Sequence, residues 1–417
     1  MHGAAILDHK QLYRLPWTLP DNAISWLEPT SACNLACDGC YRENVASSHK
    51  SLDIVRDEIN AFHRLRNSDG ISIAGGDPLM HPGITDIVRM VAETGMKPII
   101  NTNGGKLTKE LLRELKSAGV YGFTFHIDSK QGRPHWKDKN EVELNELRLQ
   151  YAEMLAEVGG LSCAFNSTVY EDTLQYVPEL VDWAHKHIDI VHVMVFILYR
   201  AAVPQLPFDW YAGGKKIDMS PLVYLENKER KVDLKAPEVV AEIRTRFPEF
   251  TPCAYLNGTE KPDTFKWLLT GRVGTREKIY GYVGPRFMEI MQTFYHLFKR
   301  RYLAYADPKT TSLGRSMIFL SGFDDGVKHI AGEFFKSAFA NPFNVFKKLY
   351  YQSVMIIQPV DFMPNGAQNM CDGCPDVTLW NGELVWSCRM EELKHFGCWV
   401  RTVPKEGSCS NGCAEKG

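Results

Sequence analysis

Cysteines are the residues of this sequence whose type and spacing suggest chemistry. Three lie together at positions 33, 37 and 40, and two others, Cys163 and Cys253, stand alone. The last 50 residues contain six more, which are Cys371, Cys374, Cys388, Cys398, Cys409 and Cys413. In a chain of 417 residues, two such groups indicate metal ligands rather than a disulfide framework.

The first group, Cys33, Cys37 and Cys40, follows a strand-like segment and would form a loop at its carboxyl end. Three thiolates on one short loop can hold three irons of a [4Fe–4S] cluster, and the fourth iron is then open to a small molecule. A structural zinc site needs four protein ligands, whereas this loop supplies three. The spacing therefore favours an iron–sulfur cluster over zinc.

Cys33-x3-Cys37-x2-Cys40, followed by Tyr41, resembles the hallmark motif of the radical SAM superfamily. The resemblance implies that S-adenosylmethionine binds at the open iron and that a flavodoxin- or ferredoxin-type donor supplies the electron. In that family the cofactor yields a 5′-deoxyadenosyl radical, which abstracts hydrogen from an unactivated C–H. The protein orients the substrate and excludes water.

Two further motifs carry the same resemblance. Gly75-Gly76-Asp77-Pro78 is similar to the family's Gly-Gly-Glu-Pro motif, with Asp in place of Glu, and Asn101-Thr102-Asn103-Gly104 is similar to its Ser/Thr-Asn-Gly turn. The alternative for each residue alone is an ordinary turn or capping group. The cofactor-binding residues that the resemblance implies are Tyr41, Gly75, Gly76, Asp77, Asn103, Asp128, Ser129, Asn166 and Arg200.

In the tail, Cys371 and Cys374 precede a predicted hairpin that turns at Asn381-Gly382 and returns Cys388 toward the pair. This arrangement resembles the SPASM/Twitch extensions of radical SAM enzymes and implies one or more auxiliary [4Fe–4S] clusters. The spacing departs from the usual pattern, and a zinc ribbon-like tail is the alternative. The candidates for further ligands are Cys253, Cys398, Cys409 and Cys413, of which the last two could serve a third cluster or a mononuclear metal site. Cys163, inside an apolar strand, is interpreted as core.

Alternating strands and helices must position these residues. We predict six strands, at residues 24–28, 70–74, 97–101, 121–127, 161–166 and 190–196, with helices such as 52–65, 84–93 and 109–118 between them. This order predicts the α/β class, as a partial (β/α)6 TIM-like barrel. In such folds the chemistry lies at the carboxyl ends of the strands, where the motifs above also fall.

The rest of the chain predicts three further regions. Residues 1–20 are an N-terminal extension to the barrel at 21–205, residues 206–360 an aromatic-rich helical region, and residues 361–417 a small cysteine-rich domain. Two aromatic helices with flanking cations, 286–303 and 332–357, suit an interfacial helix that gives access to an acyl chain. The alternative is that they cap the barrel as ordinary core, and both hold if their apolar face lines a substrate tunnel.

Composition excludes some classes of partner. Hydrophobic residues at 44%, charged residues at 24% and a net charge of −2 are ordinary globular values, so we expect no nucleic-acid partner. The sequence has no long apolar run and no signal peptide, which predicts a cytoplasmic protein. The two aromatic helices would add peripheral membrane contact.

The favoured function is a radical SAM enzyme that acts on a hydrophobic or lipid-like substrate. The short N-terminus leaves no room for a leader-binding domain, so a SPASM-type peptide-modifying enzyme is the alternative within the class. A non-catalytic Fe–S or zinc protein, for electron transfer or as a scaffold, is the alternative of another class.

Overall fold

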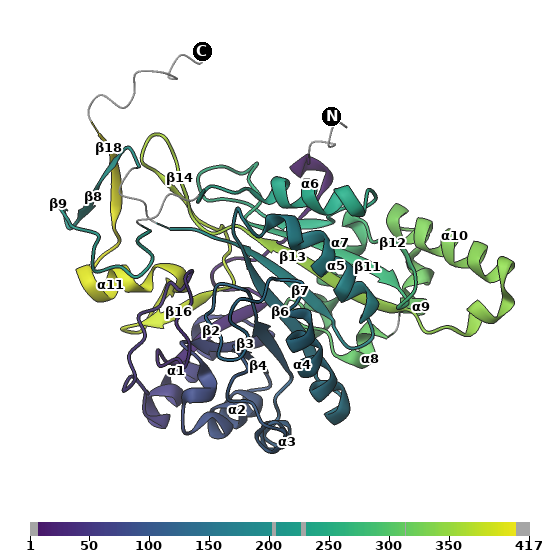
Figure 1. Cartoon of the computed structure of the whole chain (residues 1–417), viewed down its shortest axis with the longest axis horizontal. Coiled ribbons are helices and arrows are strands. Elements are labelled where there is room, and N and C mark those ends of the chain that lie inside the picture. The colour runs from purple at the N-terminus through teal and green to yellow at the C-terminus, as the bar shows by residue number, and fades with distance from the viewer. Residues whose placement is uncertain (1–6, 202–205, 227–230, 313, 406–417) are drawn as a thin grey trace, which may run out of the picture.

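The computed structural model describes residues 7–201, 206–226, 231–312 and 314–405. Its centre is a sheet in which six successive strands pair in parallel, each with the next along the chain. These strands are β2 (Ile24–Thr30), β3 (Gly70–Gly75), β4 (Lys97–Thr102), β5 (Gly122–His126), β6 (Ser162–Val169) and β7 (Val193–Leu198). The predicted α/β partial barrel is therefore confirmed, and all six carboxyl ends meet at one edge (Figure 1).

Helices connect these strands along the outside of the sheet. They are α1 (Leu52–Leu65), α2 (Ile84–Glu93), α3 (Lys109–Ala118), α4 (Asn145–Val158) and α5 (Val177–Lys186). The first three have the predicted bounds. In α1, Ser51 caps the amino end by accepting the Ile54 N–H, and Val55, Ile59 and Phe62 are buried on one face. This apolar face joins the core between helices and sheet.

The sheet continues beyond the six predicted strands. β13 (Tyr350–Ile357) pairs in parallel with β7, and β11 (Trp267–Gly274) pairs with β13 in the antiparallel sense. The remaining strands of this sheet are β1 (Tyr13–Arg14), β10 (Ala254–Leu256) and β12 (Ile279–Tyr282). Thus the region expected to be helical, 206–360, also supplies strands to the barrel.

The prediction of one helix over 332–357 is wrong at its carboxyl end. Helix α10 (Asp325–Ala340) stops before Pro342, which favours a helix end, and a short turn, η5 (Pro342–Phe346), follows. Residues 350–357 alternate inward and outward and lie between two strands, so sheet pairing determines their conformation. The other aromatic helix, predicted over 286–303, is α7 (Pro285–Lys299), and it ends where Arg300 adopts a positive φ of 56°.

Asp324 connects the two aromatic helices. Its carboxylate accepts the backbone N–H groups of Gly284 and Phe287 at the start of α7 and of Val327 in α10, each at 2.9 Å. Between these helices lie α8 (Pro308–Thr311), α9 (Gly314–Met317) and η4 (Ile318–Leu320). Figure 1 shows α10 at one end of the molecule, opposite the small sheet that contains β18 (Arg401–Pro404).

The tail packs back onto the barrel. Its elements are β14 (Asp361–Phe362), β15 (Gln368–Asn369), β16 (Val377–Trp380), β17 (Glu383–Trp386), α11 (Met390–Phe396) and β18 (Arg401–Pro404). The predicted hairpin is confirmed: β16 pairs with β17, and Asn381 and Gly382 have φ of 50° and 82°, as a type I′ turn requires. β18 pairs with β8 (Phe208–Ala212), which also pairs with β9 (Lys215–Lys216).

The remaining elements are one helix and four short 3-10 turns. Helix α6 (Ala236–Arg246) buries Val239, Val240 and Ile243. The turns are η1 (His9–Gln11), η2 (Pro78–Met80), η3 (Leu174–Tyr176) and η6 (Ser387–Arg389). The last of these contains Cys388, directly after β17.

Candidate functional site

One cavity of about 670 Å³ occupies the interior of the barrel. Cysteines from both predicted groups line it, although the two groups lie more than 300 positions apart in the sequence. These six are Cys33, Cys37, Cys40, Cys371, Cys374 and Cys388. The structure therefore brings the loop group and the tail group to a single site.

The loop thiols lie among N–H donors. The backbone N–H groups of Leu35 and Arg42 point to the sulfurs of Cys33 and Cys40 at 3.5 Å, and the Asn103 amide points to Cys33 Sγ at 3.7 Å. Burial raises the pKa of all three thiols. Thiolates at this position thus need the positive charge of bound metal, and three sulfurs with N–H donors are a donor set that fits an iron–sulfur cluster.

Gly75 and Gly76 lie directly against the start of the cysteine loop. A Cβ at Gly75, where φ is 110°, would come within 2.1 Å of the Thr30 carbonyl oxygen, and a Cβ at Gly76 within 2.4 Å of the Ser31 oxygen. Only glycine allows this approach. The pair therefore sets the position of the loop, and both residues line the cavity.

Asp77 holds the neighbouring turn. Its carboxylate accepts the Thr102 hydroxyl and the backbone N–H groups of Leu79 and Asn103, at 2.8 to 2.9 Å. The side chain is 1% exposed and is not among the residues that line the cavity. The Asn103 side chain, which this turn positions, bonds to Asn34 at 2.7 Å and does line the cavity.

Most of the other predicted cofactor residues also line the cavity: Tyr41, Asp128, Asn166 and Arg200. Burial acts to raise the pKa of Asp128, but hydrogen bonds, first from His126 at 3.0 Å, lower it. Asn166 Oδ1 has no hydrogen-bond partner in the described part of the chain. Arg200 bonds to Asp361 at 3.2 Å. Ser129 is not among the lining residues, and its N–H bonds to Glu141.

The tail cysteines lie close together. Cys371 and Cys374 are hydrogen-bonded through their thiols, and Cys388 lies near enough to Cys371 for the two side chains to interact electrostatically. Burial raises the pKa of Cys388 to about 12. The hairpin therefore returns the third cysteine to the pair, as its turn predicted.

The other cysteines lie elsewhere. Cys253 is buried in the apolar core, where its thiol donates to the Leu269 carbonyl at 3.4 Å. Cys398 follows α11 at an intermediate exposure, and neither residue lines the cavity. Cys163 is fully buried in β6, as predicted for a core residue. Cys409 and Cys413 lie outside the described residues.

Arg42 is a site residue that the sequence motifs did not indicate. Its guanidinium bonds to both carboxylate oxygens of Glu28 on β2, and to the carbonyl and hydroxyl of Ser387, next to Cys388. Arg42 is 4% exposed. It thus connects the cysteine loop to the tail. Its position directly after Tyr41 was the available signal, but its partners are distant in the sequence.

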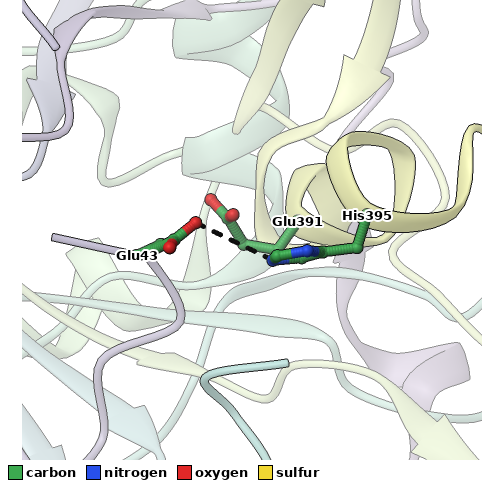
Figure 2. Close-up of side chains that lie close together, drawn as sticks. All are labelled: Glu43, Glu391 and His395. Carbon is green, nitrogen blue, oxygen red and sulfur yellow. Dashed lines mark ion pairs between the residues drawn. The ribbon is translucent and has the colours of Figure 1, made fainter. Parts of the chain in front are cut away.

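A second contact between loop and tail involves Glu43, Glu391 and His395 (Figure 2). Glu391 and His395 lie one turn apart on α11, and His395 Nε2 is 3.8 Å from Glu43 Oε2. Their ligand atoms are close enough for one metal ion. However, Arg42 and Lys394 already pair with Glu391, at 3.3 and 2.8 Å. Arg42 and Lys394 already neutralise the carboxylate charge that would attract a metal ion. We therefore interpret Glu43, Glu391 and His395 as an ion-pair contact between the loop and the tail.

The two walls of the cavity differ in polarity. On β3 to β6 the inward side chains are mostly polar or small, with Ser72, Asn101, Thr124, His126 and Asn166 among them. On β7 and β13 every second residue points inward and most are apolar, namely Val193, Val195, Ile197, Tyr351, Ser353, Met355 and Ile357. One wall therefore suits a polar cofactor, and the other suits an apolar group.

Comparison with known proteins adds three findings. An AdoMet-dependent heme synthase of Methanosarcina barkeri is 28% identical over 224 residues, 51% of this chain and 60% of that protein. A probable GTP 3',8-cyclase of Methanococcus maripaludis is 23% identical over 214 residues, 49% of this chain and 71% of that protein. The structure of Streptococcus suis SuiB bound to S-adenosylmethionine matches 55% of this chain and 47% of its own, with a TM-score of 0.38 and 16% identity.

The curated relatives are matched over only part of their length. This chain spans 60% and 46% of the heme synthases of M. barkeri and Oleidesulfovibrio alaskensis. The model of the Radical SAM superfamily matches residues 27–184, which include the cysteine loop, the two glycines and strands β3 to β6. Residues 27–184 of this chain therefore form a domain of the radical SAM superfamily.

Proposed function

We propose that this protein is a radical SAM enzyme with an auxiliary cluster that acts on a hydrophobic, lipid-like substrate. The observation that carries the proposal is the single cavity that both cysteine groups line inside a radical SAM domain. Cys33, Cys37 and Cys40 would hold the [4Fe–4S] cluster, which, with S-adenosylmethionine and one electron from a flavodoxin- or ferredoxin-type donor, supplies a radical that abstracts hydrogen. The superfamily uses these cofactors throughout.

The chain's own residues would position the cofactor. Gly75 and Gly76 leave their backbone accessible beside the cysteine loop, and Asp77 holds the turn that presents Asn103. Asp128, Asn166 and Arg200 offer polar groups at the carboxyl ends of β5, β6 and β7. We assign these residues to S-adenosylmethionine, and Ser129 to holding the loop after β5.

We assign Cys371, Cys374 and Cys388 to the auxiliary cluster. Their support is that they line the same cavity as the loop cysteines, and that Arg42, directly after the loop, bonds to the carbonyl of Ser387 beside Cys388. Asp376 also lines the cavity near these thiols, and burial raises its pKa to about 7. The described part of the chain offers no fourth cysteine there, since Cys253 and Cys398 lie away from the cavity.

The lipid-like substrate is supported by the aromatic helices. The inner face of α7, with Phe287, Met288 and Met291, lines the cavity, while its outer residues Phe294 and Phe298 are 54% and 80% exposed. The α10 surface, as we call the exposed aromatic residues around α10, consists of Phe319, Phe323, Phe335, Phe339, Phe343 and Phe346. Monomeric proteins rarely leave so many large apolar side chains in water.

A membrane surface explains this exposure better than a core cap. The inner faces of α7 and α10 are buried and their outer faces are not. The inner faces would therefore cap the barrel as core, and the outer faces would contact the membrane. Lys336 and Lys347 have acidic neighbours at 3.0 and 3.8 Å, which reduces their attraction for anionic lipid. The aromatic side chains would therefore supply most of the binding. None of the described helices is long and apolar enough to cross a bilayer.

The test is anaerobic reconstitution followed by product analysis. We expect a [4Fe–4S] spectrum, slow reductive cleavage of S-adenosylmethionine to 5′-deoxyadenosine and methionine, and loss of about four irons in the Cys33, Cys37 and Cys40 triple alanine variant. Zinc without iron in the wild-type protein would refute the cluster. Full clusters and bound cofactor without cleavage would favour the non-catalytic alternative.

A further inference from the structure

Among the described residues, no charged side chain lines the half of the cavity that lies at the amino ends of the strands. The aspartates and arginines of this part of the chain that line the cavity are Asp38, Arg42, Asp128, Arg200 and Asp376. All five follow the carboxyl ends of strands or lie in the tail. At the amino ends, the described lining consists of uncharged residues such as Ile24, Val193 and Ser353, covered by Met288, Gln292 and residues 303–306. An ionic group in this half would have no opposite charge to offset its loss of water.

The apolar wall runs the full length of the barrel. Tyr351, Ser353, Met355 and Ile357 point inward along β13, beside Val193, Val195 and Ile197 of β7. Six residues of strand span about 20 Å, so the wall reaches from the amino ends of the strands to the cysteine end. A cavity of this length with one apolar wall fits a chain-like molecule that lies along the strands.

His192 lies at the amino end of this wall and is 4% exposed. Its Nδ1 accepts the backbone N–H of Cys163 at 2.9 Å. Burial lowers the pKa of His192 to about 4, so the ring is neutral at neutral pH. Because Nδ1 accepts, the single ring proton is on Nε2.

The Nε2–H of His192 has no acceptor among the described residues. A buried N–H without an acceptor is unfavourable, and native structures satisfy nearly all such groups with protein, water or ligand. The β6–β7 edge fixes this donor, since His192 N–H also bonds to the Cys163 carbonyl at 2.9 Å. The donor is thus rigidly held beside an uncharged, elongated cavity.

We propose that the amino end of the cavity binds an uncharged oxygen of a hydrophobic, chain-like substrate, such as an ester, ether or hydroxyl, and that His192 Nε2–H donates a hydrogen bond to it. The substrate's hydrocarbon chain would then lie along β7 and β13, and one of its carbons would lie at the cysteine end of the cavity. His192 is a specificity residue in this arrangement. The inference rests on the proposed function, because it concerns the substrate of the same site.

The experiment measures binding of three probes of matched chain length to the cluster-loaded protein: methyl laurate, dodecane and laurate. Trp17, Trp26 and Trp267 line the cavity and report occupancy by fluorescence. We expect wild type to prefer the ester over the alkane by about two- to tenfold, the effect of one hydrogen bond. Laurate should bind more weakly than the ester.

Two variants separate the donor from the fold. His192→Leu removes the donor and should abolish the ester preference while dodecane binding stays. His192→Gln keeps a side-chain N–H donor for the substrate and an oxygen acceptor for the Cys163 N–H. It should therefore retain part of the ester preference. Iron content and S-adenosylmethionine cleavage are measured on each protein, so that loss of the fold is recognised.

The outcomes distinguish the two proposals. Suppose that wild type loads iron and cleaves S-adenosylmethionine. The His192 inference is then overturned if wild type binds no probe or prefers laurate, or if His192→Leu keeps the ester preference, while the proposed radical SAM function stands. If wild type neither loads iron nor cleaves the cofactor, the proposed function itself fails. Ester preference that is lost in His192→Leu and kept in His192→Gln supports the inference.

Discussion

Arg42 and Glu28 form a buried, two-point ion pair, with Arg42 Nη2 2.6 Å from Glu28 Oε1 and Arg42 Nε 2.8 Å from Glu28 Oε2. Burial acts to raise the pKa of Glu28, but Arg42 outweighs it and lowers the pKa. Because Arg42 also bonds to Ser387, the pair joins strand β2, the cysteine loop and the tail. Its removal is expected to affect fold and tail together.

Arg42→Ala should lower the free energy of unfolding by about 3 to 5 kcal/mol, because it leaves the buried Glu28 carboxylate without its cationic partner, with only the neutral donors Ser387 and Trp26 remaining. It should also reduce the iron content of the tail. Urea unfolding and iron analysis under anaerobic conditions measure both effects. Arg56→Ala is the matched control, since its pair with Asp53 at 3.1 Å is exposed and worth less than about 1 kcal/mol. Equal loss in both variants would contradict the role of the pair.

Replacing Cys371, Cys374 or Cys388 with alanine should remove the auxiliary metal and product formation while the spectrum of the loop cluster remains. The reason is that the two thiol groups lie on separate segments of the chain, although they share a cavity. Mössbauer spectroscopy of each variant counts the iron. Cys253→Ala is the control and should keep all metal, because Cys253 lies in the core. Loss of zinc alone would reduce the tail to a structural role.

The α10 surface should bind vesicles of phosphatidylcholine with anionic phosphatidylglycerol. Replacing Phe339, Phe343 and Phe346, which are 89%, 78% and 80% exposed, with serine should reduce flotation more than replacing Lys347 and Lys348 with glutamine. Each cation contributes about 1 kcal/mol at an anionic surface, and inserted aromatic area supplies more. Folding is checked by iron content. Equal flotation of wild type and the phenylalanine variant would return the peptide-modifying alternative to first place.

Asp361 should make a pH-dependent contribution to stability. Burial acts to raise its pKa, but Lys266 at 2.7 Å, with Arg200, lowers it to about 2. The folded pKa lies below the unfolded value of about 3.9, so the contribution is present above pH 4 and is lost as the pH falls toward 2. Asp361→Asn should therefore be less stable than wild type by about 2 kcal/mol near neutral pH, with the difference shrinking in acid.

Chemical unfolding of wild type and Asp361→Asn from pH 7 to pH 3 measures this difference in stability. Both proteins are used without clusters, so that the loss of iron in acid does not contribute. Asp53→Asn, which makes the same substitution at an exposed position, serves as the control. A constant difference between Asp361→Asn and wild type across this range would contradict the assignment.

Local patterns predicted the elements whose signals are local. Helix α1 has apolar residues at helical spacing and a serine cap next to it, and the Asn381-Gly382 turn determines its hairpin without help from distant residues. The loop cysteines and the two glycines are also near neighbours in the sequence. Their meeting at one cavity follows from parallel strands that end at the same edge.

Features that depend on distant contacts were missed. The apolar residues of Tyr350–Ile357 are compatible with either a helix or a strand. The segment forms a strand because it pairs with β7 and β11. Arg42 bonds to Ser387 at a separation of 345 positions. His192 acquires a fixed proton only because Cys163 N–H occupies Nδ1. No spacing rule contains these relations.

Strand β13 has a consequence for biosynthesis. Gln352 bonds to the Val191 carbonyl, 161 positions earlier in the chain, so β7 leaves the ribosome long before its neighbour exists. At about 5 to 20 residues per second, the apolar side of β7 stays uncovered for roughly ten seconds or more. During this interval the nascent chain presents an unpaired strand that other chains could join. The delayed arrival of β13 thus leaves the edge of β7 exposed to pairing with other chains until residues 350–357 have been synthesised.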